Sequence, residues 1–294
     1  MTASSVNRRT ALVTASYAGD LERCRLLCET VDHHVRGHDH HYLLVAGHDM
    51  KLFRDLEGPR RTVVDERDLL PSWLHCFPDP IAGGGKRIWL SLRTLPLRGW
   101  HVQQLRRIAI ASHVDQEALL YCDSDVAFVR DFDCDTLWDG DDLRLFRREG
   151  GLRRSGLDQQ RLWSENAGRV LGIAGSRTSE HDYIATVIAW RREAADAMRR
   201  RIEAVSGRDW VAAVAASRQF SECMMYGRFA DDVQGGAGHF HDERELCRVY
   251  WTGPALSDQT FREFIAAMTP EQVAIGVQSF IGTDVGRIRR WLAA

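Results

Sequence analysis

The feature that most limits the fold is an alternation of short apolar runs with helical segments near the start of the chain. Apolar runs of strand length occupy residues 11–16, 42–46 and 62–64. Between the first two runs, apolar residues recur every three or four positions from Leu21 to Val31, and Asp20 precedes them as a helix cap. This alternation predicts an α/β protein with a parallel sheet, and ligands of such sheets bind at the carboxyl ends of the strands.

A fourth apolar run, residues 119–122, ends in two acids, Asp123 and Asp125, and an apolar segment resumes at Val126. Alternate side chains of a strand share one face, so both carboxylates are expected to point the same way. Acids are poor strand and core residues, whereas Mg²⁺ and Mn²⁺ favour carboxylate oxygen. We therefore predict that this Asp-X-Asp holds a divalent cation against the diphosphate of a nucleotide-sugar.

The composition is that of an ordinary globular protein. Hydrophobic residues make up 44% and charged residues 27% of the 294 residues, enough for a large core. The net charge of −2 gives no reason to expect wholesale binding of nucleic acid or of anionic membranes. Seven scattered cysteines without a zinc pattern, no secretion signal and no apolar run near the length of a membrane span predict a cytoplasmic protein.

Several segments outside the acidic strand carry groups suited to ligand binding. Residues 71–99 are expected to be irregular, and the glycine-rich segment 83–87 resembles a hinge that could fold over a phosphate, although it lacks the P-loop spacing. A helix of about thirteen residues begins at Gly99 and leads into the acidic strand. Glu222, in an apolar surrounding, is either a satisfied structural residue or a catalytic or acceptor-binding carboxylate.

Taken together, these pieces resemble the GT-A glycosyltransferases and, more closely, a bacterial family of GT-A-like proteins of unknown function. The shared features run nearly end to end and are Gly19-Asp20, Gly99-Trp100, Gln103-Gln104, Asp123-Ser124-Asp125, residues 183–190, Phe220-Ser221-Glu222, Tyr226-Gly227, Tyr250-Trp251 and Gln278-Ser279. The resemblance implies a Rossmann-like fold with a mixed, mainly parallel central sheet flanked by helices. It also implies one domain over residues 1–294, with a nucleotide-binding half at 1–140 and an acceptor-side half at 141–294.

The resemblance further implies a role for each candidate donor-binding residue. The residues expected to contact the nucleoside, sugar or phosphates of a UDP- or GDP-linked sugar are Thr14, Ser16, Tyr17, Asp49, Asp65, Lys86, Gln104, Arg107, Asp123 and Ser124. Asp123 and Asp125 are the expected ligands of Mn²⁺ or Mg²⁺, and His239 or His241 is the candidate third ligand. If the reaction inverts configuration, Glu222 or Asp182 is the expected base for the acceptor hydroxyl.

The function expected from the sequence is metal-dependent transfer of a sugar from a nucleotide diphosphate to a small-molecule or carbohydrate acceptor. Two alternatives remain. In a haloacid-dehalogenase-like phosphatase, Asp123 would be the nucleophile, but that residue follows the first strand of such folds, whereas three strand candidates precede it here. The second alternative is a non-catalytic nucleotide-sugar-binding protein. Such a protein would not need both acids, so the intact Asp123 and Asp125 count against it.

Overall fold

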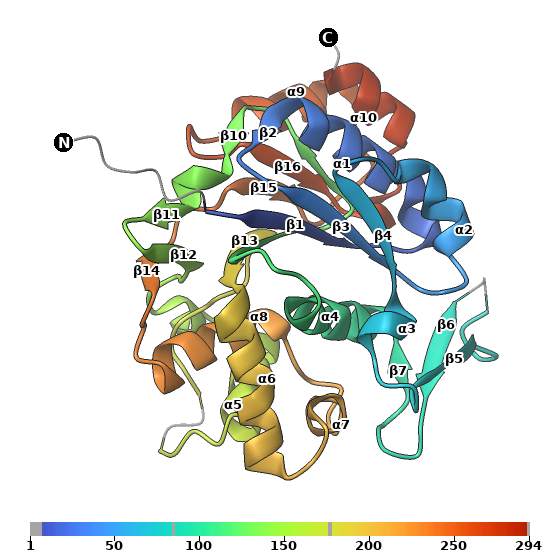
Figure 1. Cartoon of the computed structure of the whole chain (residues 1–294). Coiled ribbons are helices and arrows are strands. Elements are labelled where there is room, and N and C mark those ends of the chain that lie inside the picture. Colours follow the sequence, from blue (N-terminus) through green and yellow to red (C-terminus); the bar gives the residue numbers. More distant parts are fainter. Residues whose placement is uncertain (1–7, 84–85, 176–177, 293–294) are drawn as a thin grey trace.

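The computed structural model describes residues 8–83, 86–175 and 178–292. A five-stranded sheet forms its centre (Figure 1). Its strands, in spatial order, are β13 (Val187–Arg191), β8 (Ala118–Cys122), β1 (Thr10–Ala15), β3 (His40–Val45) and β4 (Arg61–Asp65).

Four of these strands run parallel and one runs against them. β1 pairs in parallel with β3 on one side and with β8 on the other, β4 extends the sheet beyond β3, and β13 pairs antiparallel with β8. The mixed, mainly parallel sheet predicted from the strand–helix alternation is therefore confirmed. Because parallel strands share a direction, the segments that follow β1, β3, β4 and β8 all leave from the same edge.

Helices cover both faces of this sheet, which explains the apolar character of its strands. Figure 1 shows α1 and α10 on one side and α4, α6 and α8 on the other. Along β1, Leu12 packs on the α1 side, whereas Ala11 and Val13 pack on the α4 side, as a period of two requires. The helices are α1 (Leu21–His34), α2 (Met50–Phe53), α3 (Glu66–Leu69), α4 (Gly99–Ala109), α5 (Asp158–Val170), α6 (Arg192–Ser206), α7 (Trp210–Val214), α8 (Glu222–Arg228), α9 (Asp258–Ala266) and α10 (Val285–Leu292).

Smaller sheets join segments that are distant in the sequence. Strand β9 (Val126–Phe128) leaves the central sheet and pairs antiparallel with β16 (Ala274–Val277), which pairs in parallel with β15 (Cys247–Tyr250). Two more small sheets are formed by β2 (Val35–Arg36) with β10 (Phe132–Asp133), and by β11 (Trp138–Asp139), β12 (Asp142–Phe146) and β14 (His239–Asp242). The pairing of β9 with β16 brings the C-terminal part of the chain beside the Asp-X-Asp.

Residues 71–99 are more ordered than we expected from their glycines and prolines. They contain a three-stranded antiparallel sheet of β5 (His75–Pro78), β6 (Arg87–Leu90) and β7 (Leu97–Arg98). Trp89 of β6 is buried and donates through Nε1 to Glu66 Oε1 at 3.1 Å, which attaches this small sheet to α3. Gly84 and Gly85 of the predicted hinge lie outside the described residues.

No helix in the described parts of the chain combines the length and the apolarity that crossing a bilayer requires.

Candidate active site

The carboxyl edge of the central sheet gathers most of the polar residues singled out from the sequence. Ser16 and Tyr17 follow β1, Asp49 lies in the turn after β3, and Asp65 ends β4. Asp123 follows β8 directly. The topology therefore brings these residues to one edge, as expected for a ligand site of a parallel sheet.

The Asp-X-Asp itself is a turn, and the prediction that it continues a strand was wrong. β8 ends at Cys122, and the backbone amide of Val126 donates to the Asp123 carbonyl at 3.2 Å. The chain then enters β9, whose partner β16 is held beside the turn by a hydrogen bond of 3.1 Å from Val277 N to the Asp125 carbonyl. A turn frees both acids from the strand, so their proximity comes from the turn rather than from a shared strand face.

Asp123 is held by Arg107, the last basic residue of α4. Arg107 Nη1 lies 3.3 Å from Asp123 Oδ1 and 3.0 Å from Glu222 Oε1. The Arg107 and Glu222 side chains are only 8% and 7% exposed, whereas the Asp123 side chain is 31% exposed. Burial would lower the pKa of Arg107, but Glu222 and Asp123 raise it above its ordinary value, so the guanidinium stays charged. Asp123 is thus a fixed, partly exposed carboxylate, and burial raises its pKa against the effect of Arg107.

Gln104 and Ser221 position Glu222 at the start of α8. Gln104 Oε1 accepts a hydrogen bond of 3.0 Å from the Glu222 amide, and Ser221 caps the helix through the amide of Met224. Gln104 is buried and its Nε2 also donates to the Trp100 carbonyl at 3.4 Å, so both ends of its side-chain amide have partners within the protein. Burial raises the pKa of Glu222, against the effect of Arg107.

Asp125 faces a second carboxylate that the sequence did not identify as a site residue. Asp20 is buried, and its Oδ2 accepts a hydrogen bond of 3.3 Å from Ser124 Oγ instead of capping α1. Oδ1 of Asp125 and Oδ1 of Asp20 are both buried without a hydrogen-bond partner in the described chain. Burial, Asp123 and Asp20 together raise the pKa of Asp125 to about 7, although Arg23 opposes the shift.

Residues near the C-terminus complete this side of the site. Ser279 lies beside the Tyr17 and Asp20 side chains. Arg23 of α1 donates to the Val277 carbonyl at 3.0 Å and to the Thr283 carbonyl at 2.9 Å, which anchors the segment after β16. The Gly19-Asp20 and Gln278-Ser279 pairs of the family resemblance mark the same places, and they are the only sequence signal that could have found these residues.

Three predicted donor-binding residues have structural partners at this edge. Thr14 Oγ1 is buried 3.0 Å from His41 Nε2, so its hydroxyl faces the sheet. Asp49 accepts a hydrogen bond of 2.9 Å from the Ala18 amide and fixes the loop after β1. Asp65 caps α3 and binds Arg67.

Of the remaining predicted residues, Ser16 and Tyr17 lie at this edge, whereas Lys86 lies away from it. The Ser16 hydroxyl is buried and unpartnered in the described chain, and Tyr17 is exposed beside it. Lys86 is exposed at the start of β6, on the small sheet.

The two candidate histidine ligands lie in other hydrogen-bond networks, away from the Asp-X-Asp. His239 Nε2 is 2.7 Å from the Tyr226 hydroxyl and its Nδ1 is 3.0 Å from the Ala237 carbonyl, so both ring nitrogens are occupied. The Tyr226 hydroxyl also accepts from the Arg191 amide, at the end of β13 that pairs with the start of β8. His239 therefore lies at the opposite end of β8 from Asp123.

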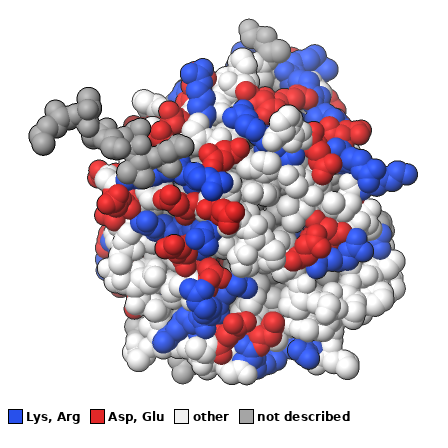
Figure 2. All heavy atoms as spheres, in the orientation of Figure 1, with Lys and Arg blue, Asp and Glu red and all other residues white. Residues whose placement is uncertain are grey.

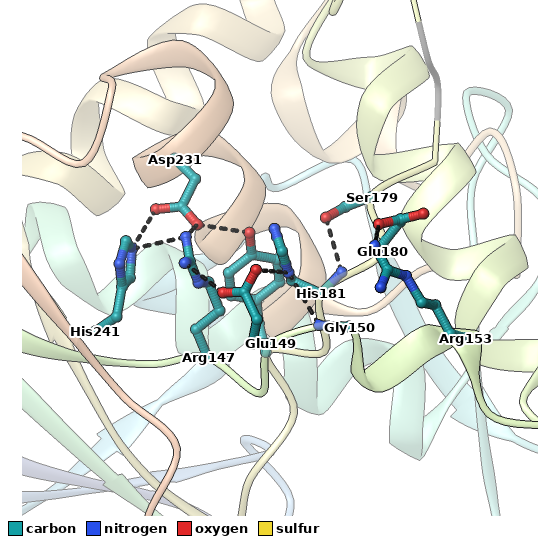
Figure 3. A network of polar contacts seen from close by, with 10 residues as sticks. Arg147, Glu149, Gly150, Arg153, Ser179, Glu180, His181, Asp231 and His241 are labelled. Carbon is teal, nitrogen blue, oxygen red and sulfur yellow. Dashed lines mark hydrogen bonds and ion pairs between the residues drawn. The ribbon is translucent and has the colours of Figure 1, made fainter.

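His241 belongs to a network centred on Asp231 (Figure 3). His241 Nε2 and the Tyr183 hydroxyl each lie 2.7 Å from the Asp231 carboxylate, and Arg147 Nη1 lies 3.1 Å from it. We call Arg147, Tyr183, Asp231 and His241 the Asp231 network. Asp182, the second candidate base, accepts a hydrogen bond from the Ile184 amide and pairs with Arg148 at 3.4 Å.

The carboxylates at the turn fit a divalent cation that is shared with a ligand. Among the described residues, no group of three His, Cys, Asp or Glu side chains is placed to hold a metal ion. Mg²⁺, however, is commonly held by one or two carboxylates and completes its shell with substrate phosphates and water. The partly exposed Asp123 carboxylate and the unpartnered Oδ1 of Asp125 meet that description.

Comparison with known proteins supports this fold. A crystal structure of the galactosyltransferase LgtC with donor and acceptor sugar analogues matches with a TM-score of 0.51 and 15% sequence identity, over 96% of this chain and 95% of LgtC. An active-site mutant of LgtC matches over the same shares with a TM-score of 0.49 and 14% identity. The GT-A fold predicted from the sequence is thus confirmed. A search of curated proteins finds no match.

The sequence also matches a family model over residues 9–270, nearly the whole chain. That model is described as a family of unknown function, DUF6492. The chain therefore belongs to the DUF6492 family.

Proposed function

We propose that this protein is a glycosyltransferase that moves a sugar from a nucleotide diphosphate to the hydroxyl group of a small-molecule or carbohydrate acceptor. The observation that carries the proposal is the pair of acids, Asp123 and Asp125, directly after β8 at the carboxyl edge of a GT-A sheet. Asp123 is held by Arg107, and Asp125 carries an unpartnered oxygen. The likeness to LgtC supports the fold, and these residues support the activity.

Asp123 and Asp125 would hold Mn²⁺ or Mg²⁺, which stabilises negative charge on a leaving diphosphate when bound. Arg107 acts as a positioning residue. It fixes Asp123 and neutralises part of the negative charge that Asp123, Asp125 and Glu222 bring together. We expect Tyr17, exposed after β1, and the neighbouring Ser16 to line the nucleoside side of the site.

Glu222 is the stronger of the two candidate bases for an acceptor hydroxyl. It shares Arg107 with Asp123, and burial raises its pKa toward the range in which a carboxylate accepts protons efficiently. Burial raises the pKa of Asp182 as well, but the cation bound to Asp182 is Arg148 and not the Arg107 that Glu222 shares with Asp123. Glu222→Gln is expected to lower turnover far more than Asp182→Asn if the reaction needs a base.

Thermal denaturation in a panel of nucleoside diphosphates, with and without Mn²⁺, tests the proposal. A ligand that binds only the folded protein raises its stability by about 2.7 kcal/mol at a hundred times its Kd. We expect UDP or GDP to raise the melting temperature only with Mn²⁺ present, and Asp123→Ala to abolish the rise. Phosphate release from simple phosphomonoesters would instead favour a phosphatase, and binding without sugar transfer to any acceptor would favour a non-catalytic protein.

A further inference from the structure

The small sheet β5–β7 and its two loops, residues 75–83 and 86–98, carry a concentration of exposed apolar side chains. Antiparallel partners Phe77 and Ile88 share its outer face, and Leu90 lies on the same face opposite His75. Trp89 and Leu97 point to the other face and are buried against the body of the protein. The outer face of a surface sheet is normally polar, so this face is unusual.

Each of the two loops of the small sheet carries an aliphatic residue that protrudes into solvent. Ile81, in the loop between β5 and β6, is 86% exposed, and Leu92, after β6, is fully exposed. Trp100, where α4 begins directly after the sheet, is 48% exposed. Figure 1 shows β5, β6 and β7 projecting from the side of the molecule. Protruding aliphatic side chains flanked by cations are typical of a surface that enters the headgroup region of a bilayer.

The charges of the small sheet are positive, although the chain as a whole has a net charge of −2. Its basic residues are Lys86, Arg87, Arg93 and Arg98, and its one acid is the buried Asp79. The only ion pair that the described chain makes here joins Arg98 Nε to Asp79 Oδ2 at 3.2 Å. Elsewhere on the face shown in Figure 2, basic and acidic side chains are interspersed. The other three cations of the small sheet form no ion pair in the described chain, although the Arg93 guanidinium lies 5.4 Å from the centre of the Trp73 ring.

From this combination we propose that the small sheet docks the protein onto the surface of an anionic phospholipid bilayer. Ile81 and Leu92 enter the interface, while Lys86, Arg87 and Arg93 contact lipid phosphates. The two loops leave opposite ends of the antiparallel sheet, so the apolar outer face lies between the two aliphatic tips and the cations beside them. A face of this kind, with a net positive charge, complements an anionic lipid surface. Arg107 follows Trp100 by seven residues of α4, about 10 Å, so docking would hold the Asp-X-Asp close to the bilayer. The proposal does not rest on the transfer activity.

Co-sedimentation of the full chain with lipid vesicles tests the proposal. Each basic residue near an anionic surface strengthens binding about fivefold, so three should give about a hundredfold preference for equimolar phosphatidylglycerol and phosphatidylcholine over phosphatidylcholine alone. The variant Lys86→Gln/Arg87→Gln/Arg93→Gln is expected to lose that preference. Arg200→Gln/Arg262→Gln/Arg290→Gln removes the same charge from exposed residues elsewhere and is the matched control, expected to bind like the wild type.

A second pair of variants tests the aliphatic tips. Ile81→Ser/Leu92→Ser should weaken vesicle binding at least tenfold, and Val205→Ser, an exposed apolar residue on α6, should not. Of the five side chains changed in the small-sheet variants, those at 81, 86, 92 and 93 are exposed and that of Arg87 is half-buried, so the melting temperature should change little and confirm folding. Equal binding to both vesicle types, or equal loss in the matched controls, would overturn the proposal. The proposal would also fail if the wild type formed a dimer that Ile81→Ser/Leu92→Ser dissociates and did not bind vesicles.

Discussion

The turn at Asp123–Asp125 and the Asp231 network both gather charged side chains, but they differ in how completely these are bonded. Asp231 accepts hydrogen bonds from Tyr183, His241 and Arg147. In contrast, Asp125 and Asp20 each keep a buried oxygen without a partner in the described chain. Folded proteins rarely leave such atoms unpaired, and an exception asks for an explanation such as a bound ion. The difference supports our proposal that a ligand binds at the turn and that the Asp231 network is a structural element.

The pKa values of Asp125 and Asp231 shift in opposite directions, in line with this difference in bonding. Burial raises the pKa of Asp125 to about 7, whereas the hydrogen bonds of the Asp231 network outweigh burial and lower the pKa of Asp231. A raised pKa means that folding is favoured by protonation, and a lowered pKa means that folding is favoured by ionisation. Without a cation, Asp125 therefore costs stability at neutral pH, while Asp231 contributes stability there.

The largest effect is expected from removing the guanidinium of Arg107. Arg107→Met leaves Glu222 buried without a cation, and breaking a buried ion pair in this way typically costs about 3–5 kcal/mol. Urea denaturation should show that loss. Arg147→Met is the matched change in the Asp231 network, and it should cost about 1 kcal/mol because Tyr183 and His241 remain bound to Asp231. Equal losses would contradict the ranking, and Arg107→Met/Glu222→Leu should recover part of the stability.

The next effect separates ligand binding from stability. Asp125→Asn removes a cation ligand and should weaken Mn²⁺-dependent binding of a nucleoside diphosphate at least a hundredfold, roughly 2.7 kcal/mol. The same change removes an unpartnered buried charge, so it should stabilise the metal-free protein by roughly 1–3 kcal/mol. Titration calorimetry and urea denaturation measure the two quantities. If Asp125→Asn binds as the wild type does, the metal assignment fails.

The opposite result, a loss of stability without a loss of ligand binding, is expected for a change in the Asp231 network. Asp231→Asn weakens three hydrogen bonds and should cost about 1–3 kcal/mol of unfolding free energy. Because His241 and Arg147 lie outside the proposed cation site, nucleotide binding should not change. A loss of Mn²⁺-dependent binding in Asp231→Asn would return His241 to the list of metal ligands.

The smallest effect is a pH dependence of cation binding. Asp125 must be ionised to bind a cation, so the apparent Mn²⁺ affinity should fall about tenfold, or ~1.4 kcal/mol, for each pH unit below about 7. In the metal-free protein the stabilisation from protonated Asp125 is complete below its unfolded pKa of about 3.9 and is lost as pH rises through about 7. The stability advantage of Asp125→Asn should therefore grow between pH 5 and pH 8. A constant advantage would show that Asp125 does not titrate in that range.

Local sequence patterns determined much of this fold. Alternating apolar runs and helical segments were sufficient to predict the parallel strands β1, β3 and β4 and helix α1, because both periods follow from backbone geometry. The same patterns placed Asp123 at a strand end. The strands of the small sheet were not predicted, because their glycines and prolines hide segments of only two to four residues.

Only the tertiary structure decided which residues meet. Arg107 and Glu222 are far apart in the chain and share a contact because α8 packs beside α4. Asp20 reaches Ser124 because α1 begins where β1 ends, next to β8. His239 and His241 were plausible ligands by residue type, yet the register of β14 with β12 places them in other networks. Composition and periodicity report on each segment alone, whereas a site depends on the pairing of segments, which the shared core sets.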